Sequence, residues 1–297
     1  MHIVTLRDPS SSMQAQFVPD AGMIGSSLLD SGVQLLGQHR GLDAYISDAK
    51  TMGIPILYPW ANRLGDNTYT AEGATVELTL GSNGVRPDPN GLPIHGVLAA
   101  YPRWRVITES ENELTAETDF GADPELLASF PFPHLLALSV RLAERTLTVR
   151  TAVTPTGDKA VPLCFGFHPY LQLAGVPRRE WIIETPPLRH LGLDERSLPT
   201  GESSNQQATT EPLGDKTFDD GYDHVPVGAV FAVSGGGRRI EVHFEQGYPA
   251  AQIFAPPGED VVCFEPMAAP TDALRRGGYR VARPGDSAVA QFSIRVG

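Results

Sequence analysis

Short runs in which apolar and polar residues alternate recur along most of the chain. The clearest pair covers residues 136–142 and 147–153, on either side of the turn Ala143-Glu144-Arg145-Thr146. Alternation with a period of two is typical of a strand that buries one face and exposes the other. These two runs therefore predict an antiparallel β-hairpin.

The same pattern predicts strands elsewhere in the chain. Turn residues such as Asp30-Ser31-Gly32 and Glu72-Gly73 separate the runs and favour hairpins. We expect strands at 12–19, 104–108, 113–120, 180–184, 229–233, 238–244, 249–254, 261–264 and 287–296, and hairpins at 23–36 and 69–78.

Helical periodicity is nearly absent. Residues 41–52 are the best candidate for a short helix or an irregular turn, and Leu42, Tyr45 and Ile46 fit a helical face. Residues 175–217 are rich in Pro, Arg, Ser and Gln, so we expect long surface loops there around one strand at 180–184. Residues 275–279 are expected to form a turn.

Many short strands separated by turns predict an all-β protein, a sandwich or a barrel with large antiparallel sheets and few short helices. The chain has 297 residues, without an exact internal repeat or a clear linker. A single all-β unit can reach roughly this size, so we expect one domain over residues 1–297.

The net charge and the N-terminal residues limit the kinds of partner and the location that we expect for this protein. The formal net charge of −12 argues against nucleic acid and against an anionic membrane surface, both of which require basic patches. It fits a neutral or weakly charged small molecule and leaves room for a local arginine pocket that binds phosphate. The N-terminal residues do not resemble a signal peptide, and no apolar run is long enough to span a membrane. We therefore expect a cytoplasmic protein.

Two cysteines, Cys164 and Cys263, are too few for a secreted disulfide scaffold or for a four-cysteine zinc site. We interpret both as small buried apolar residues. The histidines and carboxylates do not stand at ligand spacings such as His-x-His, so we do not predict a metal site. A Gly-x-Ser-x-Gly turn is missing, and Gly235–Gly237 precedes a strand rather than a phosphate-binding helix.

Polar residues at the ends of apolar segments are the candidates for chemistry. Arg63, His95, His168 and Glu265 each stand beside Pro or Gly where such a segment ends. Taken singly, each of the first three is better explained as a structural residue. Glu265 is the strongest candidate, because it directly follows Val261-Val262-Cys263-Phe264 and a carboxylate there is costly unless it is partnered or faces a cleft.

Asp219, in an acidic run ahead of a predicted strand, is a fifth candidate, although Asp-Asp-Gly is also turn chemistry. The inventory that remains is acid–base chemistry by a carboxylate and a histidine, with polar residues to hold a ligand. Aromatic residues that could pack against the apolar faces of a sugar ring are Tyr58, Trp60, Tyr170, Tyr222 and Phe254. The acid–base residues, the polar residues and these aromatic residues together suit a neutral polyol as the ligand.

Four short motifs occur in a recognisable order. They are Asn62-Arg63 with Gly65 and Tyr69, Ile94-His95-Gly96 with Trp104, Phe167-His168-Pro169-Tyr170, and Phe264-Glu265-Pro266-Met267. In this order, and spread over most of the chain, they resemble the aldose 1-epimerase (galactose mutarotase) family.

The resemblance implies a β-supersandwich fold and a cofactor-free isomerase that acts on a small sugar. It implies Glu265 as the base for the anomeric hydroxyl and His168 as the acid for the ring oxygen. Such groups need pKa values near the working pH, so we expect the pKa of Glu265 to be raised and His168 to stay partly protonated. We also expect the two to face one cleft, about the width of a sugar ring apart. Arg63, His95 and the adjoining Asn62 would bind hydroxyls.

One element departs from the family pattern. Asp219-Asp220-Gly221-Tyr222 selects Asp219 as the substrate-binding aspartate, whereas Gly221-Tyr222-Asp223-His224 selects Asp223. We favour Asp219, because divergent members carry a similar Asp-x-x-aromatic pattern.

Two alternatives to a hexose mutarotase remain. One is a hexose-6-phosphate 1-epimerase that uses Arg178-Arg179 or Arg275-Arg276 to bind phosphate. The other is a non-catalytic sugar-binding protein on the same fold. The protein is expected to be a monomer or a homodimer.

Overall fold

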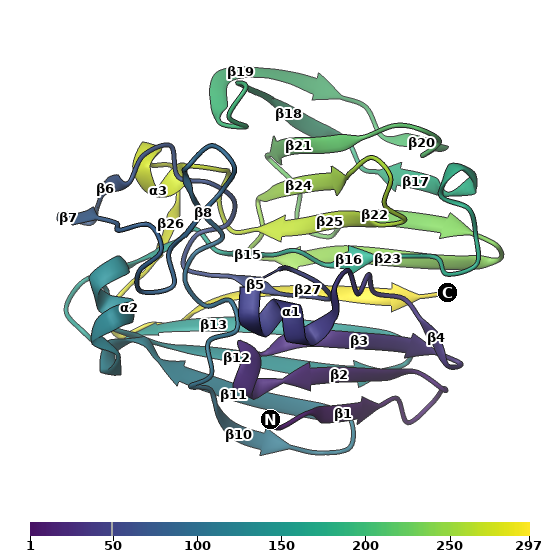
Figure 1. Cartoon of the computed structure of the whole chain (residues 1–297), viewed down its shortest axis with the longest axis horizontal. Coiled ribbons are helices and arrows are strands. Elements are labelled where there is room, and N and C mark those ends of the chain that lie inside the picture. Colours follow the sequence, from purple (N-terminus) through teal and green to yellow (C-terminus); the bar gives the residue numbers. More distant parts are fainter. Residues whose placement is uncertain (49) are drawn as a thin grey trace.

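Two large antiparallel sheets dominate the computed structural model, which describes residues 1–48 and 50–297 (Figure 1). The nine-stranded sheet has the order β10 (Arg105–Glu109), β11 (Glu113–Asp119), β12 (His134–Ala143), β13 (Thr146–Pro155), β27 (Ala288–Val296), β23 (Arg238–Gln246), β22 (Ala229–Gly235), β17 (Ile182–Thr185) and β20 (Thr209–Pro212).

The eight-stranded sheet carries the polar residues discussed below. Its order is β19 (Pro199–Gln206), β18 (Leu188–Leu193), β21 (Phe218–Asp223), β24 (Ala250–Ala255), β25 (Val262–Met267), β15 (Gly166–Phe167) and β5 (Ile56–Leu57), with β16 (Tyr170–Leu171) also paired to β25.

Smaller elements surround these sheets. A four-stranded sheet runs β1 (Val4–Arg7), β2 (Gln14–Val18), β3 (Ile24–Asp30) and β4 (Val33–Gln34). Two-stranded sheets pair β14 (Val161–Leu163) with β26 (Arg280–Ala282), β6 (Thr68–Ala71) with β7 (Ala74–Glu77), and β8 (Arg86–Pro87) with β9 (Pro93–Ile94). The described helices are α1 (Gly41–Asp48), α2 (Pro124–Ser129) and α3 (Ala273–Arg276), with 3-10 turns η1 (Pro19–Ala21), η2 (Phe120–Ala122) and η3 (Arg178–Glu180).

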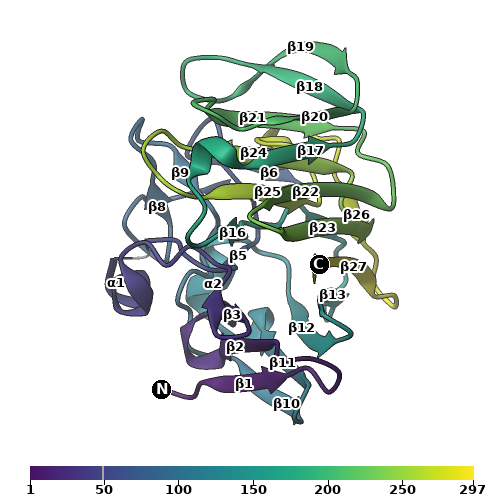
Figure 2. The same cartoon turned by 90° about the vertical axis from the view of Figure 1, so that its right-hand side faces the viewer.

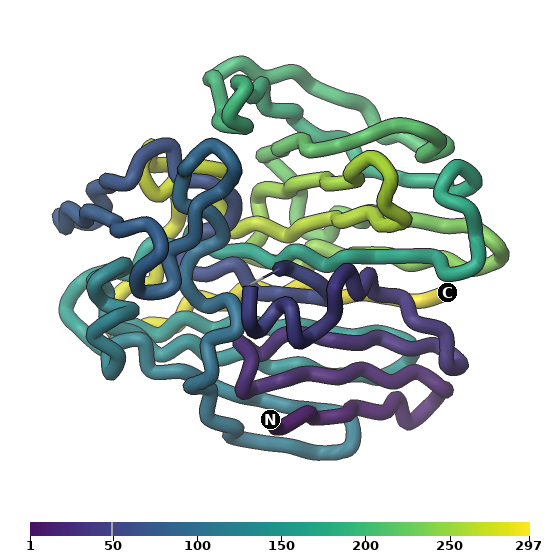
Figure 3. The backbone as a smooth tube through the Cα atoms, in the orientation of Figure 1, coloured from purple at the N-terminus to yellow at the C-terminus, as the bar shows by residue number. Residues whose placement is uncertain are grey.

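The core lies between the two large sheets. The ring of Phe167 in β15 is 5.0 Å from that of Phe292 in β27, and Phe231 in β22 is 5.6 Å from Phe264 in β25. Figure 2 shows the sheets as stacked layers. The chain trace in Figure 3 places the four-stranded sheet and the β18–β19 hairpin at opposite ends of the molecule. This is the all-β sandwich that the sequence pattern predicts.

Most predicted strands are present. The hairpin at 136–142 and 147–153 is β12 and β13, and Glu144 and Arg145 both have positive φ, as a tight two-residue hairpin turn requires. The predicted helix is confirmed as α1 up to Asp48, and residue 49 lies outside the described part of the chain. Both cysteines are free and buried, as predicted.

Four predictions were wrong. Residues 175–217 contain four strands, β17 to β20, rather than one strand among loops. β19 is an exposed edge strand of mostly polar residues, so it has no buried face to produce alternation. Arg275 and Arg276 end helix α3 instead of lying in a turn. Asp219 lies inside β21 and Glu265 inside β25, rather than before and after a strand.

Candidate active site

Strand pairing brings His168 opposite Glu265. β15 and β16 both pair with β25, through Gly166 with Met267 and Tyr170 with Cys263. His168 lies in the bend between these pairs, where Pro169 supplies no backbone N–H for the ladder. As a result, His168 Nε2 lies 3.2 Å from Glu265 Oε1.

This direct contact differs from the separation of a sugar-ring width that we predicted. The anomeric and ring oxygens of an aldose are both bonded to C1. An acid and a base that serve these two oxygens can therefore stand side by side, and the expected separation was wrong.

Burial controls the protonation of this pair. Glu265 is 1% exposed, and burial, reinforced by the charge of Asp219, raises its pKa well above the usual value, against the opposing charge of Arg63. Burial likewise lowers the pKa of His168 to about 3, with a small opposing effect from its backbone. The prediction for Glu265 is confirmed, whereas that of a partly protonated His168 was wrong. The pair therefore holds one proton, which burial places on the carboxyl group.

Three buried polar atoms in this cluster have no hydrogen-bond partner among the described residues. They are Glu265 Oε2, His95 Nδ1 and His168 Nδ1. Buried polar atoms are nearly always paired, so unpaired ones side by side indicate a place for a ligand. The rings of His95 and His168 are nearly perpendicular with centroids 5.9 Å apart. Burial, followed by the charge of His168, lowers the pKa of His95 well below its usual value, so His95 is neutral.

The backbone around His95 is tightly constrained. His95 has a φ of 61° and Asn62 one of 52°, and the His95 N–H donates to the Asn62 carbonyl at 2.9 Å. A positive φ is unfavourable for a histidine and occurs mainly where the surroundings enforce it, often at functional sites. At Gly96 a Cβ atom would lie 2.0 Å from the Tyr58 carbonyl oxygen. This glycine therefore permits the close backbone approach beside His95.

Arg63 is fixed by a buried carboxylate. Its Nε donates to Asp88 Oδ2 at 2.8 Å, and the Asp88 side chain is fully buried. The other oxygen of Asp88 accepts from the backbone N–H groups of Asn90 and Leu92, both at 2.8 Å. Sequence reasoning missed Asp88, because Pro-Asp-Pro-Asn-Gly also reads as an ordinary turn.

Gln252 connects the remaining polar residues of the site. It stands opposite Glu265 on the neighbouring strand β24. Its Nε2 donates to Asp219 Oδ1 at 2.7 Å, and its Oε1 accepts from Asn62 Nδ2 at 3.3 Å. Asp219 Oδ2 lies 3.9 Å from Arg63 NH2. Sequence reasoning missed Gln252 as well, although a glutamine between Ala and Ile in a buried strand was a usable signal.

Asp223 belongs to a different group of residues. It accepts two hydrogen bonds from Arg189, at 2.6 and 2.5 Å, and one from His224 at 3.0 Å. Burial alone would raise the pKa of Asp223, but these hydrogen bonds outweigh it and lower the pKa. The structure thus places Asp219 beside Arg63 and Glu265, and Asp223 at the far end of the same strand.

Aromatic side chains pack around His168. The Tyr170 ring is stacked on it at 4.3 Å, with its hydroxyl 3.4 Å from Nε2, and Phe254 meets it edge-on at 5.4 Å. A cavity of about 580 Å³ opens beside Tyr170 and Phe254. Of the other predicted aromatics, Tyr58 and Trp60 are core residues, 1% exposed, and Tyr222 packs against His190.

In the part of the chain that the structure describes, no three His, Cys, Asp or Glu side chains gather as metal ligands would. None of the described helices has the length and apolar character needed to cross a membrane.

Comparison with solved structures identifies the fold as galactose mutarotase-like. A galactose mutarotase-like protein from Clostridium acetobutylicum superposes with a TM-score of 0.82 at 18% identity, over 100% of this chain and 98% of the other. A galactose mutarotase related enzyme from Lactobacillus acidophilus gives 0.81 at 17% identity, over 100% and 97%. Galactose 1-epimerase from Lactobacillus acidophilus NCFM gives 0.75 at 16% identity, over 99% and 93%.

The amino-acid sequence identifies the family, whereas the solved structures identify the fold alone. The family model for aldose 1-epimerase matches residues 3–295. The chain belongs to the aldose 1-epimerase family, as the four motifs in the sequence predict.

Proposed function

We propose that this protein is a mutarotase that interconverts the α and β anomers of an unphosphorylated aldose, with Glu265 and His168 as the proton-transfer pair. The observation that carries the proposal is their 3.2 Å contact in a buried cluster where Glu265 Oε2 has no protein partner among the described residues. A non-catalytic sugar-binding protein would gain nothing from a buried pair of this kind, and an unpaired buried carboxylate oxygen costs stability.

Ring opening needs one proton removed and one supplied. A base takes the proton of the anomeric hydroxyl, the bond between C1 and the ring oxygen breaks, and an acid protonates that oxygen to give the open-chain aldehyde. Rotation about C1–C2 and closure by the reverse transfers give the other anomer. Each turnover returns both protons, so the one proton held by the pair is sufficient.

Ligand binding prepares the pair for this reaction. Transfer of the shared proton from Glu265 to His168 across their contact gives a carboxylate base and an imidazolium acid. Sugar hydroxyls that donate to Glu265 Oε2 stabilise the carboxylate, as does the guanidinium of Arg63, whose charge already acts to lower the pKa of Glu265. His95 and Asp219 would bind hydroxyls elsewhere on the ring.

Two of the four arginines that suggested a sugar phosphate, Arg178 and Arg275, are engaged elsewhere. Arg178 donates to the backbone carbonyls of Gly214 and Lys216, and Arg275 pairs with Asp272 at 3.2 Å. These contacts favour an unphosphorylated sugar. Comparing glucose with glucose 6-phosphate in one assay tests this choice, and a large preference for the phosphate would contradict it.

Polarimetry tests the proposal itself. Freshly dissolved α-glucose and α-galactose relax to their anomeric mixtures, and the protein should accelerate relaxation of at least one of these or of a related aldose. Failure to accelerate any aldose in a broad panel over the buffer rate would contradict the proposed function.

A further inference from the structure

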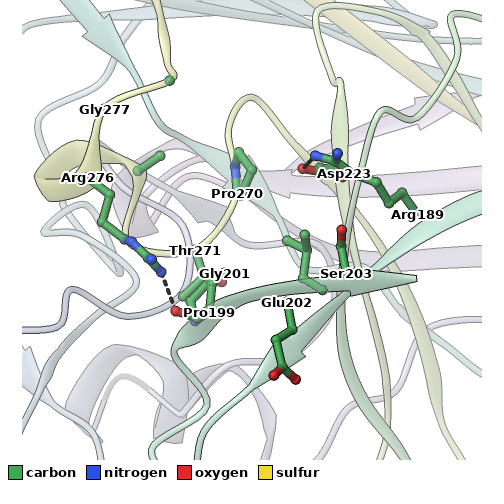
Figure 4. A pocket seen from close by; sticks show the side chains of 13 residues that line it. Arg189, Pro199, Gly201, Glu202, Ser203, Asp223, Pro270, Thr271, Arg276 and Gly277 are labelled. Carbon is green, nitrogen blue, oxygen red and sulfur yellow. Dashed lines mark hydrogen bonds and ion pairs between the residues drawn. The ribbon is translucent and has the colours of Figure 1, made fainter. Parts of the chain in front are cut away.

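A second cavity lies on the same sheet face as the acid–base pair. It has a volume of about 350 Å³ and is bounded by β18, β19, the end of β21 and the segment that leads into α3. Figure 4 shows Arg189 and Asp223 on one side, Pro270 and Thr271 behind, and Arg276 with its bond to the Pro199 carbonyl opposite.

The strand register connects this cavity to the site. Gln252 stands opposite Glu265, and Gly221 stands opposite Gln252. A Cβ on Gly221 would contact both Gln252 Oε1 and the side chain of Leu191, so these residues share one face. Strands are spaced about 4.8 Å apart, which puts Leu191 roughly 14 Å from Glu265 along the sheet. A single pyranose ring at Glu265 does not reach that far, and a second sugar unit extends the ligand towards Leu191.

The cavity wall is also tied to the loop that carries Arg63. The Asp272 N–H donates to the Arg63 carbonyl at 3.1 Å, and the Gly65 N–H donates to Asp272 Oδ1 at 2.8 Å. A ligand in the cavity would therefore touch a segment that is hydrogen-bonded to the candidate active site.

The lining suits a neutral polyol. Arg189 uses two of its five N–H donors in hydrogen bonds to Asp223, which leaves donors for ligand hydroxyls. The pair as a whole is neutral, and Glu202 and Arg276 add one charge of each sign. Leu191, Pro199 and Pro270 provide apolar surface for the C–H faces of a ring.

We propose that this cavity is a subsite for the second sugar unit of a reducing disaccharide or longer saccharide whose reducing end lies at Glu265 and His168. The inference rests on the proposed function. With C1 at Glu265, the opposite end of the ring points towards Asp219 on β21. A glycosidic substituent at that end extends past β21 towards Leu191 and the Arg189–Asp223 pair.

The test compares anomer exchange of glucose with that of maltose, cellobiose and lactose, by exchange NMR of the reducing-end H1 signals. At least one disaccharide should have a kcat/KM about tenfold above that of glucose, the effect of one or two hydrogen bonds to a charged residue. If glucose exchange is accelerated and no disaccharide is preferred, the subsite is wrong while the proposed function stands. If no aldose is accelerated, the proposed function itself fails.

Variants of the cavity residues test whether the preference for a disaccharide depends on this cavity. The double variant Arg189→Leu, Asp223→Leu removes the pair without leaving one charge unpaired, and it should lower the disaccharide-to-glucose ratio of kcat/KM about tenfold. Ser203→Phe, on exposed edge strand β19, should lower the ratio by filling the cavity if the double variant does not fold. The matched control Arg179→Leu, at an exposed arginine outside the cavity, should keep the wild-type ratio. An unchanged ratio in a folded cavity variant would overturn the proposal.

Discussion

A deeply buried histidine is associated with each of the two large sheets, and the two histidines differ in their hydrogen-bond partners. His134 in β12 of the nine-stranded sheet is fully buried, with Nε2 2.5 Å from the Tyr58 hydroxyl and Nδ1 2.5 Å from the Phe132 carbonyl. His168, beside β25 of the eight-stranded sheet, instead faces a buried carboxyl group that has a free oxygen. Burial lowers the pKa of both, of His134 to about 4.

We interpret His134 as a residue that stabilises the fold and His168 as a candidate for proton transfer. The ring of His134 is also stacked on Phe120 at 4.6 Å, so every part of this side chain is used within the fold. The group around His168 leaves hydrogen-bonding capacity unused, which costs stability and is expected where a ligand completes the site. Three of the predictions below change one histidine environment or the other, and one changes how the neighbouring Arg63 is held.

The largest effect is expected at the acid–base pair. Glu265→Gln and His168→Asn should each lower kcat for anomer exchange by about 10²–10⁴-fold, the usual contribution of a general acid or base. Stability in urea should change little or rise for Glu265→Gln, because an ionisable group leaves the interior. Exchange NMR and urea unfolding of the same preparations check both points. A Glu265→Gln variant with more than half of the wild-type kcat would refute the assignment.

His134→Asn should show the reverse pattern. Loss of its two hydrogen bonds and its stacked ring should lower the free energy of unfolding by about 2–4 kcal/mol. Activity per folded molecule should stay close to wild type, because the structure places His134 outside the site. Urea titration measures the first quantity, and kinetics at a temperature where the variant is folded measure the second. A tenfold loss of kcat in folded His134→Asn would contradict a purely structural role for His134.

Asp88→Asn tests how Arg63 is held. The asparagine oxygen can still accept from the Asn90 and Leu92 N–H groups, but the charge-assisted bond to Arg63 Nε is lost, because the amide group that replaces Oδ2 can only donate. We expect kcat/KM to fall about tenfold, mainly through KM, and the melting temperature to fall as well, because a buried ion pair loses one partner. Asp158→Asn, at an exposed position, is the control and should leave both unchanged. Equal losses in the two variants would remove Asp88 from the site.

The smallest effect is a change in the pH dependence of stability. Unfolded His168 binds a proton below its ordinary pKa of 6.5, whereas folded His168 does so only near 3. The contribution of His168 to stability therefore falls as the pH drops from about 6.5 towards 3, whereas Glu265, whose pKa is raised, contributes in the opposite direction above its ordinary pKa of 4.5. Relative to wild type, His168→Asn should lose less stability as the pH falls from 6.5 to 4 in urea unfolding. An identical slope in wild type and variant would show that His168 is not buried as a neutral group.

Regular strands were predictable from sequence because each buries one face. In β12 the residues Leu136, Leu138, Val140 and Leu142 are 0–1% exposed, and the alternation between them is direct evidence of that face. β25 is buried on both faces, so Glu265 could not be placed inside the strand from pattern alone. The polar edge strand β19 gave no signal for the opposite reason, since almost all of it is exposed.

The residue types of the site were predictable, but their contacts were not. The four motifs identified Asn62, Arg63, His95, His168 and Glu265, because each combines a polar group with Pro, Gly or aromatic neighbours. Gln252 joins Asn62 to Asp219 only through cross-strand neighbours, which depend on sheet register. The direct contact of His168 with Glu265 likewise depends on both β15 and β16 pairing with β25.

The most direct test of the account is anomer exchange at equilibrium, followed by NMR between the α and β H1 signals of a panel of reducing sugars. We predict exchange cross-peaks well above the buffer rate with wild-type protein and their loss with Glu265→Gln at the same concentration. Wild-type protein without accelerated exchange for any sugar, or a Glu265→Gln variant with undiminished exchange, would contradict it.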